Sequence, residues 1–133
     1  MSARVLVVND DLRLAESVGS LLADEGYETR IARDGLAAIE TLSEWPADLV
    51  LLDLMMPHLN GWEFLERRAH EPLLARSPVV VWSVAPPVEL ERARSLGADE
   101  CLPGGATAPD DLLEVVSDVL MRRPSYSASA QHS

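Results

Sequence analysis

Short apolar runs alternate along this chain with stretches of helical spacing. The runs at 5–8, 49–52 and 79–82 are continuously apolar, which is typical of strands buried on both faces of a parallel sheet. Between the runs, apolar residues recur every three or four positions, as Leu14, Val18 and Leu21 do, and this predicts amphipathic helices. The expected strands are 4–8, 27–32, 49–52, 79–82 and 100–102, and the expected helices are 12–25, 34–44, 61–71, 87–97 and 109–121.

The ends of these elements carry residues that favour caps and turns. Gly26 stands where the first helix should end, Asp34 can cap the second, and Pro87 can open the fourth. The alternation of strands and helices predicts an α/β fold, a single doubly wound parallel sheet of five strands with five helices. We expect one domain over 1–123, followed by a tail at 124–133 that has nothing to bury and should be disordered.

Composition narrows the class of protein. A chain of 133 residues is long enough for one domain with a real core. The net charge of −11 argues against direct nucleic-acid binding, which needs a basic face. A single cysteine excludes an internal disulfide and fits a reducing compartment. The apolar runs are too short for a signal peptide or a membrane span, so we expect a cytoplasmic protein without membrane contact.

Carboxylates follow two of the predicted strands directly. Asp53 ends the run 50–52, with Pro57 and an Asn-Gly turn close behind, and Asp10 follows the run 5–8. The first and third strands are neighbours in this architecture, so both side chains should reach one crevice at the carboxyl edge of the sheet. Two carboxylates repel each other unless a cation lies between them, and Mg²⁺ is the natural candidate. Read singly, either acid could instead be a capping or turn residue.

Together these motifs resemble the receiver domain of bacterial two-component response regulators, over about residues 4–121. The resemblance implies a flavodoxin-like fold and a signalling protein rather than an enzyme. It also implies that Asp53 accepts a phosphoryl group from a histidine kinase or phosphotransfer protein, and that an unknown downstream protein reads the result. By the same resemblance, Mg²⁺ would be held by Asp10, Asp53 and the backbone carbonyl of Met55, with Asn9 acting through a water molecule. Ser83, at the end of the fourth strand, would hydrogen-bond a phosphoryl oxygen.

Four positions depart from the family pattern. Gly104 and Gly105 stand where receivers carry Lys-Pro, and Cys101 stands where they carry an aromatic residue that reports phosphorylation. The chain contains no lysine at all, so only Ser83 and backbone N–H groups are expected to meet the phosphoryl charge. Asn9 replaces the first of the two acids that usually follow the first strand, which removes one negative charge from the metal site. A weakened switch is the expected consequence.

Two other functions remain open. The missing lysine and aromatic favour a pseudo-receiver, a protein-interaction module that does not depend on phosphorylation. A small Mg²⁺-dependent phosphohydrolase would share the strand-end Asp nucleophile, but nothing in the sequence supplies a general acid or a substrate-binding cap. The three tryptophans are expected to pack in the core, with Trp82 facing away from Ser83, and the histidines show no ligand spacing.

Overall fold

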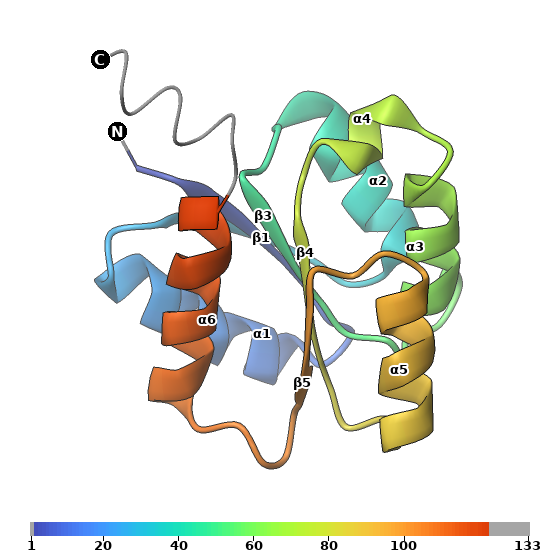
Figure 1. The fold of residues 1–133 in the computed structure, drawn as a ribbon. Helices are drawn as coiled ribbons and strands as arrows, with labels where there is room; N and C mark the ends of the chain where they lie inside the picture. The colour runs from blue at the N-terminus through green and yellow to red at the C-terminus, as the bar shows by residue number, and fades with distance from the viewer. Residues whose placement is uncertain (1, 123–133) are drawn as a thin grey trace.

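The chain folds into three layers, a parallel sheet between two sets of helices (Figure 1). The structure is a computed structural model that describes residues 2–122, so the expected tail at 124–133 lies outside the described residues. The strands are β1 (Arg4–Val8), β2 (Glu28–Ala32), β3 (Leu49–Leu52), β4 (Val79–Ser83) and β5 (Glu100–Pro103). The helices are α1 (Leu12–Asp24), α2 (Gly35–Glu44), α3 (Gly61–Arg68), α4 (Pro72–Ala75), α5 (Pro87–Ser95) and α6 (Pro109–Arg122).

The sheet has the order β2-β1-β3-β4-β5, and all four strand pairs are parallel. Helices α1 and α6 cover one face, and α2 to α5 cover the other (Figure 1). Successive residues of a strand point to opposite faces, so Val5 and Val7 pack under α1 and α6, while Leu6 and Val8 belong to the core on the other face. Both faces are therefore apolar. The predicted fold class is confirmed.

The prediction was wrong about the third helix. The pattern predicted one helix over 61–71, but α3 ends at Arg68 and a separate short helix, α4, begins at Pro72. Proline has no N–H to donate and its ring clashes with a preceding helical turn, whereas it fits the first position of a new helix. Residues 2–122 therefore contain six helices, where five were expected.

The predicted caps are present. Asp34 accepts the N–H of Ala37 at 2.8 Å and opens α2. At the start of α3, Asn60, which was predicted only as part of a turn, forms a reciprocal capping box with Glu63. Gly26 follows α1 with a φ of 94°, a left-handed conformation that glycine adopts without strain. Local sequence therefore decided where these elements begin and end.

The tryptophans pack as expected. Trp45 is buried, and the guanidinium groups of Arg4 and Arg30 lie 5.3 and 5.1 Å from its ring centre. Trp62 packs against the core under α3, and Trp82 packs on the α1 and α6 face. No helix within residues 2–122 is long and apolar enough to span a bilayer.

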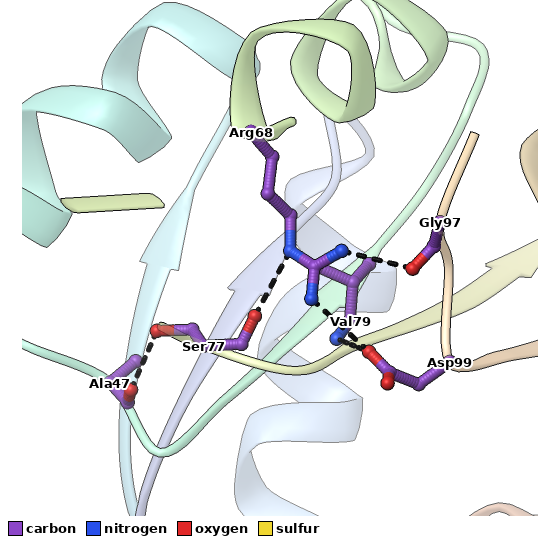
Figure 2. Close-up of polar contacts among 6 residues, drawn as sticks. All are labelled: Ala47, Arg68, Ser77, Val79, Gly97 and Asp99. Carbon is purple, nitrogen blue, oxygen red and sulfur yellow. Dashed lines mark hydrogen bonds and ion pairs between the residues drawn. The ribbon is translucent and has the colours of Figure 1, made fainter. Parts of the chain in front are cut away.

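A polar network closes the amino edge of the sheet, at the start of β4 and β5 (Figure 2). Arg68, the last residue of α3, donates to the carbonyl oxygens of Ser77 at 3.1 Å and Gly97 at 2.9 Å, and to the carboxylate of Asp99 at 3.3 Å. Asp99 also accepts the N–H of Val79 at 2.7 Å. One arginine thus ties α3 to the segments that lead into two strands.

Candidate functional site

Asp53 is held at the carboxyl edge of the sheet by its own backbone. Its N–H donates to the carbonyl of Val8 at 2.9 Å, which extends the pairing of β1 and β3 one residue beyond the strand. Its Oδ1 accepts the N–H of Leu54 at 2.9 Å. Helix α3 begins directly against this segment, because a Cβ at Gly61 would lie 2.5 Å from the Asp53 carbonyl oxygen. The half-buried carboxylate is therefore fixed in place.

The turn after β1 brings the second carboxylate to the same edge. Asn9 is buried, its N–H donates to the carbonyl of Ala32 at 3.0 Å, and its amide oxygen accepts the N–H of Asp11 at 2.9 Å. Asp11 caps α1 by accepting the N–H of Leu14. Asp10, between them, is exposed. The Asn9 amide thus holds the turn, and one lone pair of its oxygen is left for a water molecule.

The electrostatics of Asp53 place its neighbours. Burial raises the pKa of the Asp53 carboxyl above its ordinary value, and the nearby charge of Asp10 adds to this rise. Hydrogen bonding from the Ser83 hydroxyl and from the N–H groups of Leu54 and Met55 acts in the opposite direction. Ser83 is itself buried and accepts the N–H of Ala85 at 3.3 Å. Asp10, Asp53 and Ser83 thus follow or end neighbouring strands at one edge of the sheet, close enough for Asp10 and Ser83 to affect the pKa of Asp53.

The donors at this edge fit a hard cation. Asp10 and Asp53 supply two carboxylates, and the exposed loop residue Met55 supplies a backbone carbonyl two positions after Asp53. Mg²⁺ prefers this combination of a few carboxylate oxygens completed by carbonyls and water. No group of three His, Cys, Asp or Glu side chains within residues 2–122 is arranged to hold a metal. A metal bound by Asp10 and Asp53 would therefore need backbone and water oxygens to complete its coordination.

Gly104 lies beside Ser83. Its N–H donates to the Ser83 carbonyl at 2.7 Å, and a Cβ at this position would lie 3.1 Å from the Ser83 carbonyl carbon. Position 104 thus opens onto the edge that carries Asp53, but it brings no charge. Cys101 is buried in the core on the α5 face, and burial raises the pKa of its thiol. A protonated, enclosed thiol is a poor nucleophile, which argues against a redox role.

A hollow of about 440 Å³ lies beside Asp10, and sequence reasoning did not find it. It brings together Arg33 from the loop after β2 and His58 from the loop after β3. The Nδ1 of His58 lies 3.1 Å from Oδ2 of Asp34, which joins those two loops. The histidine had been given no role, and no local signal could supply one, because its partner is 24 positions away.

Known proteins similar to this chain belong to one family. Residues 5–117 match the family model described as the response regulator receiver domain. The chain is 37% identical over 102 residues to the transcriptional regulatory protein CpxR homolog of Haemophilus influenzae, covering 76% of this chain and 43% of that protein. It is 48% identical over 61 residues to the DNA-binding response regulator MtrA of Mycobacterium tuberculosis, covering 46% of this chain and 27% of that protein. The chain therefore spans less than half the length of these relatives.

Solved structures show the same fold. A response regulator receiver domain protein (CheY-like) from Methanospirillum hungatei superposes with a TM-score of 0.83 at 27% identity, covering 94% of this chain and 98% of that one. The chemotaxis response regulator CheY4 of Vibrio cholerae superposes with a TM-score of 0.80 at 26% identity, covering 90% of this chain and 99% of that one.

Proposed function

This chain belongs to the response regulator receiver family of two-component signalling, and we propose that it accepts a phosphoryl group on Asp53 with the help of Mg²⁺. The observation that carries the proposal is the position of Asp10, Asp53 and Ser83 at the carboxyl ends of three neighbouring strands, where Asp10 and Ser83 affect the pKa of Asp53. The donor would be a histidine kinase or phosphotransfer protein in the cytoplasm, and a downstream protein would read the modified state.

In the proposed transfer, a carboxylate oxygen of Asp53 attacks the phosphorus of the donor and forms the new P–O bond. The P–N bond of the donor phosphohistidine breaks, and the leaving imidazole nitrogen keeps the electron pair. Ser83 would donate its hydroxyl hydrogen to one phosphoryl oxygen. Mg²⁺, held by Asp10, Asp53 and the Met55 carbonyl and contacted through water by Asn9, would supply positive charge against the phosphoryl oxygens.

Intact mass measured after incubation with acetyl phosphate and Mg²⁺ tests the acceptor. We expect one phosphoryl increment on the parent protein and none on Asp53→Asn, and the bond should be labile to hydroxylamine, as an acyl phosphate is and a phosphoserine is not. Phosphate that stays on Asp53→Asn would remove Asp53 from the proposal. Continuous release of phosphate over many turnovers would instead support the phosphohydrolase alternative.

Calorimetry of Mg²⁺ binding tests the metal ligands separately. Asp10→Ala and Asp53→Asn should each weaken binding strongly, because each removes one of two charged oxygen ligands. Asp11→Asn is the matched control: it removes one negative charge from the adjacent position, and Asn still caps α1. If Asp10→Ala and Asp53→Asn bind Mg²⁺ as well as the parent does, these ligands are wrong.

A second candidate function, a pseudo-receiver, is favoured by Gly104 and Cys101. A glycine beside Ser83 supplies no cation for the phosphoryl group, and a small buried thiol cannot perform the swing of an aromatic side chain. A parent protein that gains no mass with acetyl phosphate and Mg²⁺, but still binds a partner protein, would support this module. A weakened switch lies between the two functions: Asp53 is modified, but the surface of α5 and α6, the fourth and fifth helices predicted from the sequence, changes little.

A further inference from the structure

The hollow beside Asp10 carries the guanidinium of Arg33 and the ring of His58 together with the carboxylates of Asp10 and Asp34. It is formed by three loops, those after β1, β2 and β3, and its volume of about 440 Å³ can hold an anionic group. Its walls are Asp10, Leu12, Arg33, Asp34, Pro57 and His58.

Arg33 is exposed, and within residues 2–122 it forms neither an ion pair nor a hydrogen bond. Six other arginines do pair with acids: Arg4, Arg67, Arg68, Arg92, Arg94 and Arg122. The neighbouring carboxylate, Asp34, is already engaged, since one oxygen accepts the N–H of Ala37 and the other lies against His58. The Arg33 guanidinium therefore keeps its donors for a ligand.

The loops around Arg33 are fixed rather than loose. His58 adopts a φ of 65°, which is uncommon for a residue other than glycine, and its ring is held by Asp34. The N–H of Gly35 donates to the carbonyl of Leu59 at 2.8 Å, and a Cβ at Gly35 would lie 2.5 Å from that oxygen. The loops after β2 and β3 are thus pinned together by two adjacent contacts beside the hollow.

We propose that Arg33 binds the phosphoryl group of the incoming donor, as a cation in a chain that has no lysine. This inference rests on the proposed phosphoryl transfer to Asp53. The planar guanidinium presents paired N–H donors that match phosphate oxygens, and it stays charged at every working pH. During transfer Arg33 donates hydrogen bonds to the non-bridging oxygens of the phosphoryl group, and its own protons stay on the guanidinium. His58 also lines the hollow.

The test is the rate of phosphorylation of Asp53 as a function of acetyl phosphate concentration, at saturating Mg²⁺. Arg33→Ala should raise the half-saturating concentration about tenfold, the effect of losing a charge-assisted hydrogen bond, and should change the maximal rate much less. Arg33→Lys should recover part of the loss, because it restores the charge without the planar fork. The unfolding midpoint should move little, since within residues 2–122 the Arg33 side chain has no ion pair or hydrogen bond to lose, only the charge effect of Arg33 on Asp34.

Arg13→Ala is the matched control. Arg13 is an exposed arginine in the first turn of α1 and does not line the hollow. Its replacement by alanine changes the net charge by the same amount. Equal effects of Arg13→Ala and Arg33→Ala would mean that only the overall charge matters, and would overturn the proposal. An unchanged half-saturating concentration in Arg33→Ala would overturn it as well.

A separate measurement distinguishes this inference from the proposed function. If the parent protein takes up no phosphoryl group, the proposed function fails, but anion binding by Arg33 is still tested by titrating inorganic phosphate into the Mg²⁺-loaded protein and following the ³¹P NMR signal. Weaker phosphate binding by Arg33→Ala than by Arg13→Ala supports the site. Equal binding by the two variants overturns it.

Discussion

Replacing Arg68 by alanine should destabilise the fold without touching the phosphoryl site. The side chain is 14% exposed and donates to the carbonyl oxygens of Ser77 and Gly97 and to Asp99 (Figure 2). A hydrogen bond from a charged group contributes roughly 1.5–3 kcal/mol, and three bonds from one group are not additive. Asp99 is 40% exposed and still accepts the N–H of Val79 in the variant, so leaving its carboxylate without Arg68 costs little. We therefore expect a loss of about 2–4 kcal/mol in the free energy of unfolding.

Urea unfolding followed by circular dichroism at neutral pH measures this loss. In a thermal scan, each kcal/mol should lower the melting temperature by roughly 3–4 °C for a domain of this size. Arg67→Ala is a matched control on the same helix: Arg67 pairs with Glu71 at 2.7 Å, but both side chains are exposed, and such a pair contributes little. Phosphorylation of Asp53 should survive in both variants, because the network lies at the amino edge of the sheet. If Arg68→Ala unfolds at the same urea concentration as Arg67→Ala, the network does not stabilise the fold as argued.

Three further predictions concern the carboxyl edge. Gly104→Lys should strengthen the response to phosphorylation, because a lysine beside Ser83 would add a charge-assisted contact to the phosphoryl group, worth roughly 1.5–3 kcal/mol. Hydrogen exchange over residues 84–105 measures this response. A large change on phosphorylation in the parent protein that is the same in the variant would contradict the prediction. Asp53→Asn should stabilise the metal-free protein at neutral pH, because the pKa of Asp53 is raised by burial and its charged form is therefore disfavoured by folding. That gain should shrink as the pH falls through the raised pKa, where the parent carboxylate takes up a proton, and melting temperatures across pH that differ by a constant amount would refute it. Gly61→Ala should cost about 1–3 kcal/mol or more, because its Cβ would lie 2.5 Å from the backbone of Asp53; Gly105→Ala, which has open space, is the control in urea unfolding, and equal stability of the two variants would show that the contact relaxes without cost.

Local pattern was sufficient for the fold and for the acidic part of the site. Continuous apolar runs indicated strands with two buried faces, and the chain direction of a parallel sheet then required Asp10 and Asp53, at the ends of neighbouring strands, to reach one edge. Ser83 followed from the same rule one strand further on. Caps such as Asp34 could also be predicted, because they act within three residues of their own position.

The remaining features depend on contacts that the pattern does not encode. The break between α3 and α4 follows from a single proline inside an otherwise helical stretch, and the hollow beside Asp10 exists only because three crossovers place their loops together. Arg33 and Arg68 are both arginines in polar stretches of the sequence, and the hydrophobic periodicity does not distinguish them. Within residues 2–122, folding gives Arg33 no ion pair or hydrogen bond at the carboxyl edge. It gives Arg68 acceptors 9, 29 and 31 positions away at the amino edge. The sequence determined which strand ends carry a carboxylate, because that depends only on the order of neighbouring residues. The tertiary structure decided where the arginines lie, because the positions of loops are set by the packing of helices far apart in the chain.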